Sequence, residues 1–305
     1  MIEPYHLLDP LLSRLAWPFG RRVEVLDVGP VRALRMARLW GGRELLAVHC
    51  FAVGDTLVDA GLACYADDVA AFARDRRASR AVVTHHHEDH VGAAARLVAG
   101  GVAVHAAEPT ARLVRDGLPI RFYQHLIWGK APPARLAPLA GEEVALGPHV
   151  ARVVPAPGHC ADQIALHVPA EGWLFSGDAF LGEHVKAFRR DEDFAGIVAT
   201  LERFLALDFD ALFCAHRPRP TGGKAAVARK LAAMREVEAQ VRALAARGLP
   251  PRAIARALPQ PRRGFTLGAL ALGDVSVENL VRSILHGPRP RREVQARAPA
   301  AATPR

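Results

Sequence analysis

The chain has 305 residues, of which 50% are hydrophobic and 23% are charged, and its formal net charge is +9. This length can bury the core of one large domain with an appendage, and no run of about 18 apolar residues predicts a membrane span. The four cysteines are scattered without a Cys-x-x-Cys pair, which favours a reduced, cytoplasmic setting over a disulfide framework. The basic charge leaves a nucleic-acid partner open, but no aromatic and basic pattern favours one.

Residues 1–22 are predicted to form an N-terminal arm. Charged residues and two prolines interrupt any apolar segment of the kind that signal peptides contain. The spacing of Leu11, Leu12 and Leu15 indicates a short amphipathic helix. Packing of this helix on its own domain is the simpler interpretation, and a contact within a homodimer is the alternative.

Residues 23–222 are predicted to form one layered domain. Strands are expected at 23–28, 31–39, 45–53, 56–59, 80–84, 102–105, 143–146, 150–154, 163–168, 172–175 and 211–214. Helices are expected at 65–78, 89–99, 108–115 and 194–207. Strands come first and then alternate with helices, which is typical of an α/β arrangement.

Residues 84–90 join a strand to a helix and contain four histidines and two carboxylates. His85 and His87 are two positions apart, so an extended backbone places both on one face and His86 on the other. Asp89 and His90 fall at the expected start of the helix, where a carboxylate is favoured. Ligand types on both sides of one turn predict a site for two metal ions rather than one.

The pattern His85-x-His87-x-Asp89-His90 resembles the signature of the metallo-β-lactamase-fold hydrolases. Four further motifs of that family occur in its order, one before this pattern and three after it. They are Asp59 before Ala60-Gly61, His159 after Gly158, Asp178 after Ser176-Gly177, and His216 after Cys214-Ala215. The resemblance implies a four-layer αββα sandwich with a small C-terminal helical module.

The same resemblance implies the roles of the motif residues. His85, His87 and His159 would hold one divalent ion, Asp89, His90 and His216 would hold a second, and Asp178 would bridge them. Asp59 and Asp162 would orient the ligands without binding the ions themselves. Zn²⁺ suits these ligands best, although Fe²⁺ and Mn²⁺ also fit. The implied catalytic carboxylates are Asp178, at the bridging water that attacks an acyl carbon, and Asp89, as a proton relay.

One segment of the layered domain carries candidate substrate residues. Residues 117–140 include an aromatic-rich stretch with Tyr123, His125 and Trp128, which predicts either a helix on the core surface or a wall over the substrate.

Cys160 is interpreted as a buried thiol whose side chain diverges from that of His159. His184 is interpreted as a surface residue.

Residues 223–287 are predicted to form a helical module, with helices at 224–247, 252–258 and 275–285 and with Ser276 as a cap. Residues 288–305 are expected to be a disordered basic tail. In the glyoxalase II branch of the family, a helical extension supplies basic residues for the glutathione carboxylate. Lys224 is the first candidate for that role, with Arg229 and Lys230 beside it. A module that only caps the core is the simpler interpretation.

The expected function is hydrolysis of a small acyl compound by a binuclear metal centre. A thioester of the hydroxyacylglutathione kind, a lactone or another ester fits the resemblance. Two other enzymes of the same fold remain as alternatives, a persulfide dioxygenase with one iron and a nuclease acting on RNA or another phosphodiester. A metal-binding protein without turnover is disfavoured because a purely structural site does not need seven ligands and an open water position.

Overall fold

The computed structural model describes residues 19–118, 120, 122–185, 187–259 and 273–288. The predicted N-terminal helix and nearly all of the predicted C-terminal tail lie outside the described residues. In the described part of the chain, every helix is too short or too polar to cross a membrane.

The first sheet has seven strands that are neighbours in sequence order. Its first three pairings are antiparallel and its last three are parallel. β1 begins four residues before the strand expected from the sequence. The strands are β1 (Phe19–Val28), β2 (Val31–Trp40), β3 (Arg43–Val53), β4 (Thr56–Val58), β5 (Arg80–Val83), β6 (Ala103–Ala106) and β7 (Ala137–Pro138).

The second sheet has five strands in the order β13-β11-β10-β9-β8, and only the β11–β13 pairing is parallel. Its strands are β8 (Glu143–Leu146), β9 (His149–Pro155), β10 (Ile164–Val168), β11 (Trp173–Phe175) and β13 (Ala211–Phe213). A separate pair of short strands joins β12 (Phe188–Arg189) to β14 (Val275–Ser276). This pair links the domain core to the C-terminal helices.

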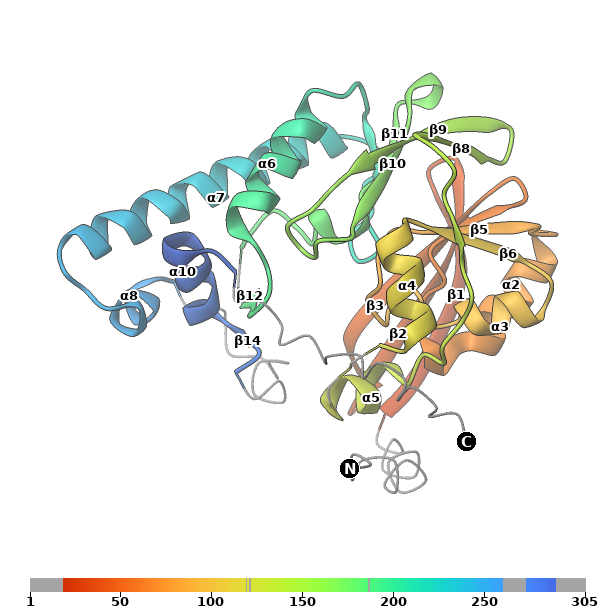
Figure 1. Ribbon diagram of the computed structural model, residues 1–305, viewed down its shortest axis with the longest axis horizontal. Coiled ribbons are helices and arrows are strands. Elements are labelled where there is room, and N and C mark those ends of the chain that lie inside the picture. The colour runs from red at the N-terminus through yellow and green to blue at the C-terminus, as the bar shows by residue number, and fades with distance from the viewer. Residues whose placement is uncertain (1–18, 119, 121, 186, 260–272, 289–305) are drawn as a thin grey trace, which may run out of the picture.

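The helices form the two outer layers, as Figure 1 shows. Those beside the first sheet are α2 (Ala66–Asp75), α3 (Ala94–Ala99) and α4 (Glu108–Asp116), with α5 (Phe122–Trp128) at its lower end. Those beside the second sheet are α6 (Phe194–Leu205) and α7 (Gly223–Ala246), and α8 (Pro251–Ala257) and α10 (Val277–His286) pack against these helices. Short 3₁₀ turns occupy Ala63–Tyr65, Pro169–Glu171 and Gly177–Ala179.

Three separate apolar cores lie between the layers. One packs the first sheet against α2–α4 and includes Met36 and Phe72. The second lies between the two sheets and includes Phe51 and Phe175. The third packs the second sheet against α6, α7, α8 and α10. Three cores require four layers, so the expected αββα sandwich with added C-terminal helices is confirmed.

The predicted start of the helix at residue 89 is wrong, because α3 begins only at Ala94. Instead, the His90 carbonyl accepts a hydrogen bond from Ala60 N, and Gly92 N donates to the Gly61 carbonyl. A Cβ on Gly92 would lie 2.2 Å from Ala63 N, so this close crossing of two backbones needs glycine. A turn pinned to residues 60–61, rather than a helix N-terminus, therefore positions Asp89 and His90.

The C-terminal helix α10 is attached to the loop that follows β12. Ser276 caps it by accepting a hydrogen bond from Asn279 N, as predicted. The Asn279 side chain donates to the Phe188 carbonyl, and the Ser283 hydroxyl donates to the Glu192 carbonyl at 2.8 Å. The module is thus packed against a segment that also reaches the candidate site.

Candidate metal centre

The motif residues meet because each follows the end of a strand at the same edge of the sandwich. β4 and β5 are parallel neighbours, so Asp59 after β4 and Thr84 after β5 leave the first sheet side by side. β11 and β13 are also parallel, which places Asp178 near His216. His159 comes from the turn between β9 and β10. Segments that are far apart in sequence therefore converge on one buried centre.

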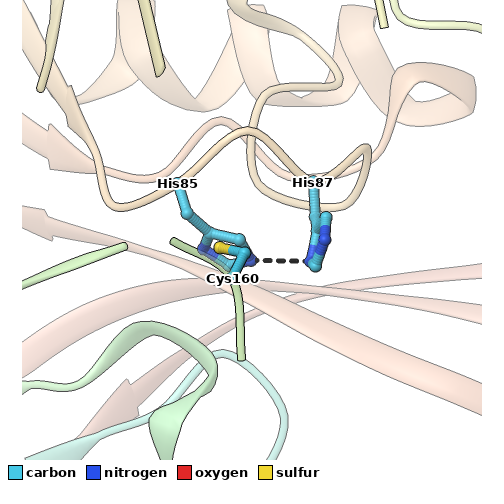
Figure 2. A group of neighbouring side chains, drawn as sticks. All are labelled: His85, His87 and Cys160. Atoms are coloured by element: carbon cyan, nitrogen blue, oxygen red, sulfur yellow. Dashed lines mark hydrogen bonds between the residues drawn. The ribbon is translucent and has the colours of Figure 1, made fainter. Parts of the chain in front are cut away.

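His85, His87 and His159 form the first group of side chains. His87 Nδ1 lies 3.1 Å from His85 Nε2 and 2.9 Å from His159 Nε2. Figure 2 shows His85 and His87 projecting from the same side of their loop, as the spacing predicted. All three residues are buried, and His87 Nδ1 faces a nitrogen of each of the other two rings.

Asp89, His90, Asp178 and His216 form the second group, in which one ligand atom from each residue lies within 4.8 Å of the others. His216 Nε2 is 3.3 Å from Asp89 Oδ2 and 3.4 Å from Asp178 Oδ2. His90 Nε2 is 3.3 Å from Asp178 Oδ1. Because the second oxygen of Asp178 is also 3.5 Å from His159 Nε2, this carboxylate belongs to both groups.

These groups fit metal ions by both spacing and chemistry. Ligand nitrogens around a tetrahedral Zn²⁺ lie about 3.3 Å apart, given Zn–N bonds of about 2.0–2.1 Å. The separations of 2.9–3.5 Å within the cluster bracket that value. His90 Nε2 and Asp178 Oδ1 are buried without a hydrogen-bond partner in the described residues. When His90 is neutral and carries its proton on Nδ1, both atoms are acceptors, and a proton or a metal ion between them satisfies both.

Partners on the outer sides of the rings fix which nitrogen faces the centre. His90 Nδ1 is 2.8 Å from Asp59 Oδ2, and His216 Nδ1 is 3.0 Å from the Ala47 carbonyl. Acceptors there hold the proton on Nδ1 and leave the Nε2 lone pair free for a cation. Asp59 also accepts from Thr84 N and has φ of +63°, a strained conformation for a residue other than glycine.

His86 points away from the centre, as predicted. Its Nδ1 lies 2.7 Å from Asp162 Oδ1, and its backbone N–H donates to Asp162 Oδ2 at 3.0 Å. The Thr110 hydroxyl donates to the same carboxylate at 2.7 Å. Asp162 thus ties the loop of residues 84–90 to α4, which keeps His85 and His87 on the inner face.

Cys160 is buried, as predicted, but its side chain does not diverge from the site. Its Sγ lies within 4.8 Å of ligand atoms of His85 and His87, and Figure 2 shows the three side chains together. Burial raises the pKa of the Cys160 thiol, and Asp162 raises it further. His159 is the third ligand that the sequence predicts for this group, and its Nε2 lies 2.9 Å from His87 Nδ1.

The two groups differ in their electrostatics. Burial lowers the pKa of His85 and of His87, which keeps both imidazoles neutral. In the second group burial opposes the charged forms, but nearby carboxylates raise the pKa of His90 and of His216 well above the usual value. Positive charge is therefore favoured beside Asp89 and Asp178, whether it comes from protons or from bound cations.

The residues predicted to contact substrate lie in different places. Tyr123 and Trp128 are buried on α5, and the Tyr123 hydroxyl donates to Asp274 Oδ2 at 2.8 Å. His125 is half-buried on the same helix. The Lys224 ammonium donates to the Leu207 carbonyl at 2.6 Å. The structure does not group these four residues with the histidine cluster, and their contact with substrate stays a prediction.

Glu192 was missed in the sequence. Its Oε1 lies 2.6 Å from His159 Nδ1, and its Oε2 accepts from Arg189 N at 2.6 Å. Glu192 therefore orients His159 in the way that Asp59 orients His90. It stands in an acidic run 33 positions after His159, and nothing in the sequence connects the two residues.

Glu192→Gln tests this role. We expect metal affinity to fall about 10–100-fold, because an amide cannot hold the imidazole proton as a carboxylate does. Titration of the metal-free protein with Zn²⁺ measures the change. Glu202→Gln is the matched control, since Glu202 lies on α6 with 48% of its side chain exposed and forms a surface ion pair with Arg235. Equal affinities for the two variants would contradict the role of Glu192.

Comparison with known proteins agrees with this geometry. The sequence model of the metallo-beta-lactamase superfamily matches residues 43–216, a segment that holds both groups of side chains. The chain therefore belongs to the metallo-β-lactamase superfamily.

Individual relatives cover less of the chain. A hydroxyacylglutathione hydrolase of Fuscovulum blasticum is 30% identical over 134 residues, which are 44% of this chain and 46% of that protein. The beta-lactamase-like protein 2 homolog of Drosophila melanogaster is 33% identical over 137 residues, 44% of this chain and 43% of that protein. The chain thus matches less than half the length of either relative.

Solved structures show the same fold. A beta-lactamase domain protein from Burkholderia ambifaria superposes with a TM-score of 0.62 at 21% identity, covering 86% of this chain and 88% of that chain. A metallo-beta-lactamase from Pontibacter korlensis superposes with a TM-score of 0.53 at 19% identity, covering 70% and 99%.

Proposed function

We propose that this protein is a binuclear metal-dependent hydrolase that cleaves a small acyl compound. The observation that carries the proposal is the position of Asp178 between the two groups. One of its oxygens is 3.3 Å from His90, and the other is 3.4 Å from His216 and 3.5 Å from His159. A single carboxylate placed in this way suits a bridge between two ions held by the seven residues predicted from the sequence.

The ligands divide into two sets. His85, His87 and His159 would hold one ion, and Asp89, His90 and His216 would hold the other, with Asp178 shared. When bound, two divalent ions supply a water of lowered pKa and polarise the substrate carbonyl. His and carboxylate ligands suit Zn²⁺ first, and also Fe²⁺ or Mn²⁺.

The chain itself supplies orientation and a proton acceptor. Asp59, Thr84, Glu192 and the Ala47 carbonyl hold the histidine rings in place from behind. Asp89 Oδ2 lies 3.3 Å from His216 Nε2 in the second group, and its carboxylate would accept a proton from the attacking water. Burial of the whole cluster excludes other water and strengthens these electrostatic contacts.

A thioester is the substrate class we propose, with a lactone or another ester next. Support comes from the curated relatives named hydroxyacylglutathione hydrolase, of which one is 30% identical over 134 residues and another 32% identical over 109 residues. No catalytic serine or cysteine is required, because the attacking group is water.

Metal-loaded protein assayed with S-lactoylglutathione, a lactone and a phosphodiester tests the proposal. We expect thioester or ester hydrolysis and two metal ions per chain by elemental analysis. Turnover of the phosphodiester alone would replace the proposal with a nuclease. One iron per chain with oxygen uptake on glutathione persulfide would replace it with a dioxygenase.

A further inference from the structure

The outer edge of the first sheet is a long strand with an open side. β1 stands at the end of the sheet and, among the strands that the structure describes, pairs only with β2. Its register with β2 runs from Phe19 to Val28 without a bulge, and its sequence contains no proline or lysine. Residues 20–25 are all exposed. Proline, lysine and bulges are the usual means by which an edge strand avoids other strands, so this edge is open to pairing.

Two valines extend the apolar face of the sheet onto this edge. Val23 is 38% exposed and Val25 is 53% exposed. In the register with β2 they lie opposite Met36 and Leu34, which are buried in the core that packs the first sheet against α2–α4. The apolar face therefore continues beyond the last interior strand, and a further strand beside β1 would remove the valines from water.

The charges of β1 change sign along the strand. Its first half carries two arginines and its second half carries two carboxylates. Arg22 pairs with Glu44 at 3.0 Å and keeps 47% of its side chain exposed. Glu24 pairs with Arg35 at 3.3 Å and keeps 48% exposed. An antiparallel second copy of β1 would place opposite charges face to face across the edge, whereas a parallel copy would place like charges together.

One antiparallel register satisfies both the charges and the valines. Backbone groups point outward at every second residue, so residues that oppose each other across a two-fold axis are separated by an even number of positions. With the axis at Val23, Arg22 lies opposite Glu24 of the second copy on both sides of the axis. Val23 then lies opposite Val23, and Arg21 opposite Val25. An axis at Glu24 would instead place two carboxylates directly opposite, which is destabilising.

We propose that two copies of this chain form a homodimer by antiparallel pairing of their β1 edges, with the two-fold axis at Val23. The inference is independent of the proposed hydrolase function. A second copy fits this edge because a two-fold interface needs a surface that is complementary to itself, and the order of charges along β1 has that property. The first sheets of the two copies would join into one continuous sheet. Because the interface is one strand wide, we expect a reversible dimer rather than an obligate one.

Exchange of the two charged residues tests the pairing in solution. Sedimentation velocity of the full-length protein over a series of concentrations should show an equilibrium between monomer and dimer. Arg22→Glu and Glu24→Arg alone should each raise the dissociation constant of the dimer about 10-fold, because each places like charges opposite one another twice. The double variant should regain most of the affinity. It loses the pairs with Glu44 and Arg35 within the chain, so only pairing between copies explains a recovery.

Cysteine crosslinking tests the register. Val23→Cys would place two thiols directly opposite, where the Cβ atoms of an antiparallel pair are about 4.5–5.5 Å apart, and mild oxidation should link the copies. Val150→Cys is the matched control, because Val150 is 57% exposed on β9 of the other sheet. The unmodified protein should stay unlinked, since Cys64 is half-buried and the other three cysteines are buried.

Two results would overturn the inference. One is a protein that stays monomeric at every concentration, which would leave the edge to another partner. The other is a dimer whose dissociation constant is unchanged in Arg22→Glu and Glu24→Arg and whose copies Val23→Cys does not link, because such a dimer uses a different surface. The first result needs only the unmodified protein, so it does not depend on a variant that folds.

Discussion

Removal of the metal ions should reduce hydrolysis by at least about a thousandfold, and addition of Zn²⁺, Mn²⁺ or Fe²⁺ should restore it. The expected loss is large because no other group of the site can lower the pKa of a water and polarise a carbonyl together. Six of the seven cluster residues are buried, and three of their atoms, His87 Nε2, His90 Nε2 and Asp178 Oδ1, have no hydrogen-bond partner among the described residues. Dialysis against a chelator, followed by an assay and by elemental analysis, measures the effect.

The same treatment should lower the melting temperature. Ion binding stabilises the folded state alone, and the ions supply positive charge beside the buried carboxylates Asp89 and Asp178. The control is protein treated in the same way with a chelator that has first been saturated with zinc. A metal-free protein that kept its rate would show that the cluster is not the catalytic centre.

Asp178→Asn is the single substitution with the largest expected effect. An amide keeps the shape of the side chain but loses the negative charge and one of the two oxygens that reach His90, His216 and His159. We expect metal content to fall from two ions to one and kcat/KM to fall at least about 10²–10³-fold, the scale of losing a preorganised electrostatic group. Elemental analysis and thioester kinetics measure the two changes separately.

Asp67→Asn is the matched control for this substitution. Asp67 has 90% of its side chain exposed, and its ion pair with Arg96 lies on the surface, where such pairs contribute little. We expect unchanged metal content and rate. Two ions and a normal rate in Asp178→Asn would exclude the bridging role.

The sequence was informative about the ligands because metal sites demand particular residue types at particular spacings. Two histidines two positions apart on an extended chain face the same way in any fold. His85 and His87 could therefore be predicted together as metal ligands, and His86 could be excluded as a ligand. The isolated motifs around His159, Asp178 and His216 were recognisable only through a family pattern. Their spacing in the sequence does not predict that they lie close together, because each follows the end of a different strand.

The sequence was less informative where local preference competes with tertiary contacts. An acidic residue before an apolar helical pattern predicted a helix from Asp89. Hydrogen bonds to residues 60–61 hold that stretch as a turn instead, and this pairing joins segments some thirty positions apart. The position of Cys160 was misjudged for a similar reason, because the turn between β9 and β10 is irregular and brings adjacent side chains to the same centre.

The amino-acid sequence alone determined the order of the longer strands and helices, the residue types of the cluster and the extent of the C-terminal helices, but not the two-residue strands β7, β12 and β14. These follow from periodicity and from ligand chemistry, which are properties of short stretches. Only the tertiary structure decided that Glu192 supports His159 and that α10 buttresses the same loop. Such contacts depend on how the layers pack, and packing brings together residues that share no local signal.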